Sequence, residues 1–220
     1  MKLLLTSSGI TNESIANALF ELTWKRPEET TVVFIPTASN VESGNKDWLI
    51  NDLINLKKQK FKSIEITDIS AVDEKIWKPS LEWADVLFFE GGNTYHLMRR
   101  LNKSGLSELL PELLKDKAYV GVSAGSMVTN PDLALKLSQT IYEEDRLETE
   151  ELKGLNFVDF YFLPHLNSKH FKKIRKENIE KVVKEISRTI YALDDNSALK
   201  IIDNKIEVIS EGERFVINEK

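Results

Sequence analysis

The chain has 220 residues, of which 41% are hydrophobic and 30% are charged, and its formal net charge is −5 at pH 7. These values predict one globular domain, residues 1–220, with a sizeable buried core. The acidic balance gives no reason to expect nucleic acid as a partner, and no apolar run approaches the length of a signal sequence or membrane span. The absence of cysteine excludes disulfides and thiol catalysis. We therefore expect a cytoplasmic protein that binds neither nucleic acid nor membranes.

Short apolar runs alternate with longer amphipathic segments along most of the chain. Strands are predicted at Lys2–Thr6, Thr31–Pro36, Ser63–Asp68, Val86–Glu90, Ala118–Val122, Asp159–Leu163 and Thr189–Leu193. Helices are predicted at Glu13–Leu22, Asp47–Gln59, Tyr95–Leu101, Ser107–Leu114 and Ser168–Ile186. The alternation predicts a three-layer α/β fold, in which helices cover both faces of a mainly parallel central sheet. In the second of these helices, Trp48, Leu49, Leu53 and Leu56 recur at helical spacing and are predicted to face the core.

Two other segments depart from this alternation. The last part of the chain holds three short apolar runs separated by turn residues, which predict a small antiparallel extension: Ala198–Ile202, Lys205–Ile209 and Arg214–Ile217. The charged stretch Glu143–Glu151 is predicted to be a loop. A solvated surface loop is the favoured interpretation, and a flap over the substrate is the alternative.

A glycine-flanked serine follows the strand predicted at Ala118–Val122. Gly121 and Gly125 surround Ser123, a spacing that suits a sharp, closely packed turn between a strand and a helix. Such a turn lifts the serine hydroxyl clear of the sheet, at the positive end of the next helix. Ser123 is therefore a candidate nucleophile, whereas Ser126, about one turn further on, is predicted to be an ordinary helix residue.

Two further polar sites end predicted strands. His165 ends one apolar run, and Asp194 and Asp195 end the next. Because the carboxyl ends of parallel strands meet at one edge of a sheet, we expect Ser123, His165 and an acid to meet there as nucleophile, base and orienting group. Successive residues of an extended chain point in opposite directions, so at most one of the two acids faces the histidine.

A glycine pair ends the strand predicted at Val86–Glu90. A Gly-Gly turn before a helix can aim the N–H of Gly92 at a developing oxyanion, with the N–H of Ala124 as its partner. Glu90, beside this turn, is either a buried orienting acid or a solvated loop residue. His96 and His170 lie in predicted helices and are expected to have surface or packing roles. The basic stretch that contains His170 is predicted to be a solvated helix face.

Four motifs together resemble those of peptidase E, a family of alpha-aspartyl dipeptidases that has cyanophycinase as a more distant relative: Glu90–Thr94, Gly121–Gly125, Pro164–His165 and Ala192–Ala198. The resemblance covers nearly the whole chain. It implies a fold similar to that of class I glutamine amidotransferases and a serine peptidase that needs no cofactor. It also implies that Ser123 is the nucleophile, His165 the base, Gly92 and Ala124 the oxyanion donors, and Asp195 the acid, at a position where the family has glutamate. Asp194 is the alternative acid.

The resemblance also implies a substrate, namely small peptides with an N-terminal aspartate. Such a substrate needs a cation near the nucleophile, and a guanidinium suits a carboxylate because it can bind both oxygens. Arg175, ten residues after His165, is the candidate, because it lies where the family's arginine would fall if the intervening loop were shorter. A solvated helix position is the alternative interpretation of Arg175. The segment after His165 is shorter than in the aspartyl dipeptidases, which leaves open the substrate side chain that this protein prefers.

Other classes of protein would need a different order or spacing of the candidate residues. A true α/β-hydrolase has its acid before its histidine, whereas here the acid follows. A metal-dependent hydrolase could use His165, Asp194 and Asp195, but the chain lacks metal-ligand spacing, and we predict no metal. A non-catalytic protein that binds small ligands on the same fold stays an alternative, as does a cyanophycinase-like exopeptidase. The sequence does not give the oligomeric state, and a homodimer stays open.

Overall fold

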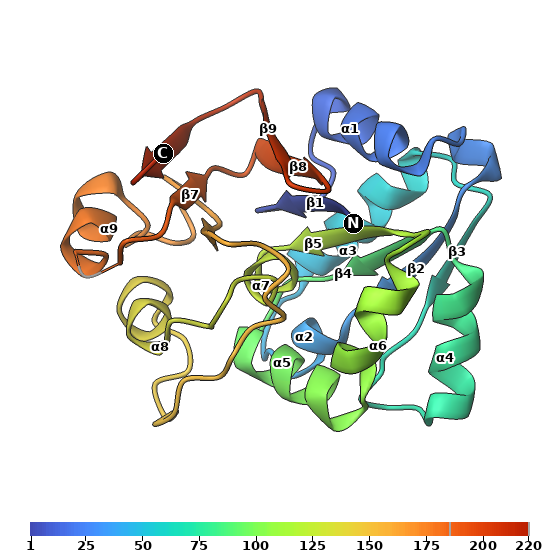
Figure 1. The fold of residues 1–220 in the computed structure, drawn as a ribbon, viewed down its shortest axis with the longest axis horizontal. Coiled ribbons are helices and arrows are strands. Elements are labelled where there is room, and N and C mark those ends of the chain that lie inside the picture. Colours follow the sequence, from blue (N-terminus) through green and yellow to red (C-terminus); the bar gives the residue numbers. More distant parts are fainter. Residues whose placement is uncertain (185, 220) are drawn as a thin grey trace.

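The computed structural model describes residues 1–184 and 186–219, so Glu185, within the helix predicted over Ser168–Ile186, and Lys220 lie outside the described residues. The main sheet has seven strands in the order β3-β2-β4-β5-β1-β8-β9 (Figure 1). The first five in this order are parallel: β3 (Ser63–Ile66), β2 (Thr31–Ile35), β4 (Val86–Phe89), β5 (Ala118–Val122) and β1 (Lys2–Thr6). β8 (Ser197–Ile202) and β9 (Lys205–Ser210) extend the sheet in antiparallel pairing.

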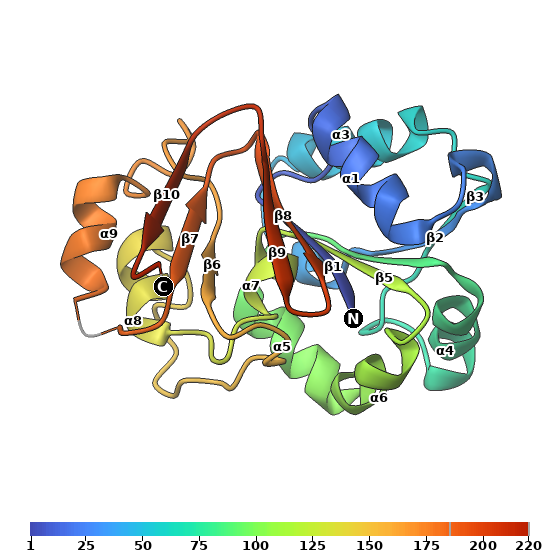
Figure 2. The ribbon, with the colours of Figure 1, turned by 45° about the horizontal axis from the view of Figure 1, so that its top comes forward.

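Helices cover both faces of this sheet, which confirms the predicted three-layer fold (Figures 1 and 2). On one face lie α1 (Glu13–Thr23) and α3 (Asp47–Lys58). On the other lie α4 (Glu74–Trp83), α5 (Thr94–Lys103) and α6 (Leu106–Leu113). The strands alternate between the two cores: Leu3 and Leu5 pack towards the α4–α6 side, and Leu4 packs towards the α1 side. Strands such as β2 and β5 are buried along their whole length, as is typical of parallel strands covered on both faces.

A second, smaller sheet lies beside the main one and has the order β10-β7-β6 (Figure 2). β6 (Tyr161–Leu163) and β7 (Ile190–Leu193) are parallel, and β10 (Arg214–Ile217) is antiparallel to β7. The sequence predicts β6 and β7 in the main sheet, and this prediction is wrong because β8 pairs with β1 and occupies that edge. Around the second sheet pack α8 (Leu135–Leu137), a π-helix (Ser138–Tyr142) and α9 (Lys176–Val182), with a separate core cluster that includes Leu163, Ile174 and Ile190.

Several local elements differ from the sequence prediction. The helix predicted over Ser168–Ile186 is limited to α9 in the described residues, because the backbone N–H of Asn167 bonds the carbonyl of Ile174 at 2.9 Å and closes the preceding segment into a loop. α4 was not predicted, since Pro79 within it interrupts the helical pattern. The remaining short elements are a 3₁₀ turn at Pro27–Glu29, α2 (Thr37–Asn40) and α7 (Ala124–Met127). None of the helices in the described part of the chain has the length and apolarity to cross a bilayer.

Candidate active site

Ser123 lies at the turn between β5 and α7 with an unusual backbone conformation. Its φ is 48° and its ψ is −107°, values that a residue with a side chain rarely adopts. The turn is held by the Ser123 N–H, which donates to the carbonyl of Thr6 in β1 at 2.9 Å. Backbone strain of this kind persists only where the surroundings enforce it, and it is concentrated at functional sites.

The flanking glycines are required by close backbone contacts. A Cβ atom at Gly121 would overlap the carbonyl of Gly125, and a Cβ atom at Gly125 would overlap the carbonyl of Phe89 in β4. Ser126 is buried in α7, where its hydroxyl donates to the carbonyl of Thr6 at 2.8 Å and accepts from the N–H of Thr6 at 3.0 Å. Ser126 thus joins α7 to β1, in agreement with its predicted role as a helix residue.

The structure brings Ser123, His165 and Asp195 into one hydrogen-bonded chain. The His165 Nε2 lies 2.9 Å from the Ser123 Oγ, and the His165 Nδ1 lies 2.7 Å from the Asp195 Oδ1. The imidazole is buried and stacks on Phe171 with 4.3 Å between ring centroids. Burial acts to raise the pKa of Asp195, but hydrogen bonds from His165 and Ser8 outweigh it and hold the pKa below its usual value. Asp195 is therefore a carboxylate at neutral pH.

Parallel pairing of β6 with β7 places the histidine beside the acid. His165 follows β6 by two residues, and Asp195 follows β7 by two residues. The N–H of Leu166 donates to the carbonyl of Leu193 at 2.9 Å, which continues the pairing beyond the strands. The sequence therefore predicts correctly that both residues end strands, although these strands belong to the second sheet.

The hydroxyl of Ser7 links this pair to the main sheet. Ser7, directly after β1, is fully buried, accepts from the N–H of His165 at 3.1 Å and donates to the carbonyl of Leu193 at 2.9 Å. The carboxyl ends of β1, β6 and β7 thus meet at one hydroxyl group. Sequence analysis missed Ser7 because a serine at a strand end carries no distinctive signal until its partners are known.

We expect Ser7→Ala to lower the free energy of unfolding by about 1–3 kcal/mol, because it leaves a buried N–H and a buried carbonyl without this partner. Urea unfolding of the purified variant measures the change. Ser43→Ala is a suitable control, since Ser43 is an exposed residue of the same region. If both variants have the same free energy of unfolding, the hydrogen bonds of Ser7 contribute little to stability.

Asp194 lies in the turn between β7 and β8. Its Oδ1 accepts from the N–H of Asn196 at 3.1 Å and from the hydroxyl of Ser197 at 2.6 Å. Its Oδ2 accepts from the N–H of Glu213 at 2.7 Å. These contacts occupy the Asp194 carboxylate in the turn, whereas the Asp195 carboxylate contacts His165.

The two candidate oxyanion donors flank Ser123. A Cβ atom built on Gly91 would lie 3.3 Å from the Cβ of Ser123, so the glycine turn after β4 packs directly against the serine. Gly92 has a φ of 128°, and a Cβ there would overlap the backbone of Ala38. Within the described residues, no hydrogen-bond acceptor contacts the N–H of Gly92 or of Ala124. Both N–H groups are therefore available to a ligand.

A pocket opens in front of Ser123. Its lining includes Ser123, His165 and Asp195, the glycine turn at Gly91 and Gly92, the β1–α1 loop and the first turns of α3. Trp48 lines the pocket and is 38% exposed, which corrects the prediction that it faces the core, while Asp52 takes the buried position on that helix. His170 also lines the pocket and lies in a loop, not in the predicted helix.

Arg175 lies outside this pocket lining. Its guanidinium donates to the backbone carbonyls of Ser168 at 3.0 Å, Phe171 at 3.2 Å and Ile174 at 2.9 Å. In the structure these donors stabilise the loop between β6 and α9, and the expectation that Arg175 contacts substrate stays a prediction. The sequence could not show this, since the shape of that loop depends on the same contacts.

The charged stretch Glu143–Glu151 is bound to neighbouring elements. Asp145 accepts from the side chain of Asn93 at 3.0 Å, and Arg99 of α5 binds Glu148 at 2.7 Å. Glu144, in the same stretch, lines the pocket. The segment is therefore a loop, as predicted, and it forms part of the pocket wall.

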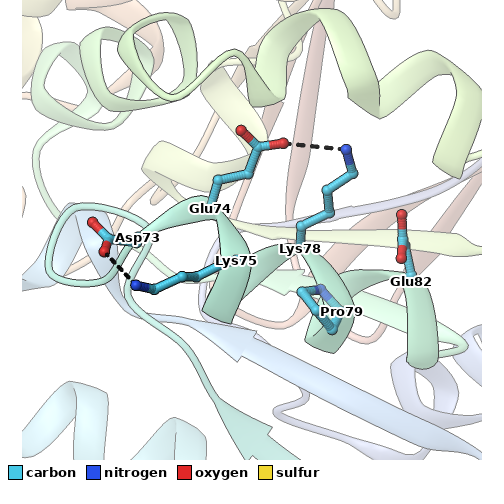
Figure 3. Close-up of a pocket in the computed structure, with 6 residues that line it drawn as sticks. All are labelled: Asp73, Glu74, Lys75, Lys78, Pro79 and Glu82. Atoms are coloured by element: carbon cyan, nitrogen blue, oxygen red, sulfur yellow. Dashed lines mark hydrogen bonds and ion pairs between the residues drawn. The ribbon is translucent and has the colours of Figure 1, made fainter.

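A separate, open hollow lies on the surface of α4 (Figure 3). Its charged lining residues pair with one another, Asp73 with Lys75 at 3.5 Å and Glu74 with Lys78 at 3.1 Å. Three of these side chains are exposed and Lys78 is partly exposed, so both pairs are screened by solvent and contribute little to stability. The hollow contains no residue of the group around Ser123, and we assign no chemistry to it.

The chain matches the model of peptidase family S51 over residues 3–209. The chain belongs to this family. An uncharacterised peptidase of Listeria monocytogenes is 32% identical over 179 residues, which cover 78% of the chain and 82% of the relative. An uncharacterised peptidase of Listeria innocua is 29% identical over 80% of the chain and 82% of the relative. The peptidase E of Streptomyces coelicolor is 28% identical over 62% of the chain and 53% of the relative.

Solved structures agree with the assignment to family S51. A crystal structure of a protein from Listeria monocytogenes EGD-e, provisionally named peptidase E, superposes with a TM-score of 0.79 at 28% identity. The match covers 96% of this S51 chain and 98% of the other. A peptidase from an acI-B1 actinobacterium shares the fold, with a TM-score of 0.68 at 18% identity. The predicted resemblance to peptidase E and the predicted fold class are thereby confirmed, and the chain is a peptidase by family.

Proposed function

We propose that this S51 peptidase hydrolyses peptide bonds in small peptides with Ser123 as the nucleophile. The observation that supports the proposal best is the continuous contact from the Ser123 Oγ to His165 and on to Asp195, at 2.9 and 2.7 Å. A base within hydrogen-bond reach of a serine, itself oriented by an acid, is the arrangement that activates a hydroxyl for nucleophilic attack.

In the proposed reaction, His165 takes the proton of Ser123 while the Oγ attacks the peptide carbonyl. The N–H groups of Gly92 and Ala124 stabilise the oxyanion of the tetrahedral intermediate. His165 then gives the proton to the leaving amine, and an acyl-enzyme forms on Ser123. Water, deprotonated by His165, releases the acid product. Asp195 stabilises the imidazolium in both halves of the reaction.

The charges that line the pocket determine which substrate side chains the proposed reaction favours. A preference for N-terminal aspartate, which the resemblance implies, requires a cation near the nucleophile. No lysine or arginine among residues 1–184 and 186–219 lines the pocket, and Arg175 is engaged with backbone carbonyls. Our proposal therefore names small peptides without an aspartate preference. The cytoplasmic location and the homodimer stay predictions.

Labelling with a serine-reactive phosphonate tests the proposal. We expect a single covalent adduct on Ser123, detected by mass spectrometry of the digested protein, together with parallel loss of dipeptide hydrolysis. Prior treatment with a chelator should change neither result. An unlabelled Ser123 in folded protein would favour the non-catalytic ligand-binding alternative, and sensitivity to the chelator would favour metal-assisted hydrolysis.

A further inference from the structure

The pocket in front of Ser123 has an acidic lining without a matching cation. Lysine and arginine are absent from the lining within the described residues. Its titratable residues are carboxylic acids and two histidines: Glu42, Asp47, Asp52, Glu90, Glu144, Asp195, His165 and His170. Asp47 is exposed, and Glu42, Glu144 and Asp195 are half-buried. The informative acids are the two that are buried, Asp52 and Glu90.

Glu90 is a buried acid without a cationic partner among the described residues. It directly precedes the glycine turn that packs against Ser123, it lines the pocket, and its side chain is 0% exposed. Among the described residues no cation pairs with this carboxyl group, and its side-chain contact is the carboxyl group of Asp52. Burial first, and the neighbouring charge of Asp52 second, raise the pKa of Glu90 well above its usual value.

Asp52 of α3 lines the pocket beside Glu90 and is 8% exposed. A Cβ atom on Gly9, in the β1–α1 loop, would lie 3.1 Å from its Oδ1. Burial raises the pKa of Asp52 to about 7; the hydrogen bond with Glu90 opposes this effect, and the charge of Asp195 adds to it. Acids from α3, from the end of β4 and from the end of β7 thus face one another beside the nucleophile.

Buried charges in folded proteins are normally paired. Lys200 of this chain follows that rule, because its ammonium contacts Glu21 and also Glu207 at 2.7 Å. Two adjacent buried acids without a cation are destabilising, and such a feature is expected where a function needs it. The countercharge that the protein lacks is therefore one that a bound molecule can supply.

We propose that Asp52 and Glu90 form a subsite for a positively charged group of the substrate, an ammonium or a guanidinium, close to the bond that Ser123 attacks. The proposal rests on the proposed function, which places the peptide in this pocket. Asp52, the more exposed of the two, contacts the cation, and Glu90 is a positioning residue behind it whose ionised form the bound cation favours. The preferred substrates are then basic peptides and not peptides with an N-terminal aspartate.

Binding to the Ser123→Ala variant tests this subsite without requiring hydrolysis. Isothermal calorimetry would compare Lys-Leu, Leu-Leu and Asp-Leu dipeptides, each with a free and an acetylated N-terminus. We expect the cationic peptides to bind about tenfold more tightly than the neutral ones, and Asp-Leu to bind most weakly among the free dipeptides. If the advantage of Lys-Leu survives acetylation, the lysine side chain is the bound group. If acetylation weakens the binding of every peptide and removes the difference between Lys-Leu and Leu-Leu, the N-terminal ammonium is the bound group.

Neutral variants show whether the two acids carry this preference. Glu90→Gln or Asp52→Asn, each combined with Ser123→Ala, should abolish the advantage of the cationic peptides while leaving acetyl-Leu-Leu binding unchanged. Asp47→Asn is the matched control, because Asp47 lines the same wall on α3 but is exposed. The proposal is overturned if both neutral variants keep the preference, if Asp47→Asn loses as much of it, or if Asp-Leu binds best.

A second readout uses the unliganded protein. Burial opposes ionisation of Glu90 in the folded protein, whereas the unfolded chain ionises this acid freely at pH 8. Glu90→Gln should therefore raise the melting temperature at pH 8 and change it little at pH 5, where both acids are protonated in the folded state. A variant that is more stable and binds cations less well is the expected result. A lower melting temperature at pH 8 would show that Glu90 stabilises the free protein and would overturn its place in the subsite. Loss of phosphonate labelling at Ser123 would instead count against the proposed reaction.

Discussion

Ser123→Ala is expected to reduce dipeptide hydrolysis by up to roughly a millionfold, the scale seen when a serine nucleophile is removed and only binding and oxyanion effects remain. The side chain is partly exposed at the turn, and the backbone N–H that holds the turn to Thr6 is retained. We therefore expect the variant to fold with unchanged stability. Initial rates on a dipeptide panel, with melting curves of the same preparation, measure both quantities.

The control for this experiment is a serine of the same pocket that does not contact His165. Ser43 lines the pocket and is exposed, so Ser43→Ala should keep activity within about threefold, a change of less than 1 kcal/mol. A folded Ser123→Ala enzyme with activity close to that of the unaltered protein would exclude Ser123 as the nucleophile. An equal loss in both variants would point to a general disturbance of the pocket.

The bounds of several strands could be predicted from local patterns. β1 and β5 of the main sheet and β10 of the second sheet have the predicted bounds, because each is an apolar run bounded by polar or turn residues. The assignment of β6 and β7 to a second sheet could not be predicted in this way. Pairing depends on which strand occupies the edge beside β1, and β8, which comes later in the chain, takes that place.

The candidate site shows the same division between local and long-range information. Ser123, His165 and Asp195 were found because each ends an apolar run, a signal that a sequence carries. Ser7 and Asp52 were missed because their importance comes from partners far along the chain. Asp52 did carry one usable signal: it lies between Trp48 and Leu56 at helical spacing, where a charged residue interrupts an otherwise apolar stripe. Arg175 shows the opposite case: spacing alone makes it a candidate for substrate binding, whereas its guanidinium donates to backbone carbonyls in the structure.

Asp195→Asn is expected to reduce the catalytic rate on the order of ten-thousand-fold while leaving the fold intact. The amide can still contact the Nδ1 of His165, but it favours the tautomer in which Nε2 carries the proton and cannot accept one from Ser123. It also removes the negative charge that would stabilise the imidazolium. Steady-state rates of the purified variant measure the loss, and circular dichroism verifies the fold.

Asp194→Asn is the matched comparison, because the same substitution is made one residue away. The Asp194 carboxylate accepts from the N–H of Glu213, a contact that an amide oriented to keep the Asn196 and Ser197 contacts would lose. We therefore expect a loss of about 1 kcal/mol in stability with activity nearly retained. The opposite ranking would assign the role of orienting acid to Asp194. Small and equal losses of activity would mean that hydrogen bonds such as the one from Ser7 to the His165 backbone are sufficient to orient the imidazole, and that the charge of Asp195 contributes little.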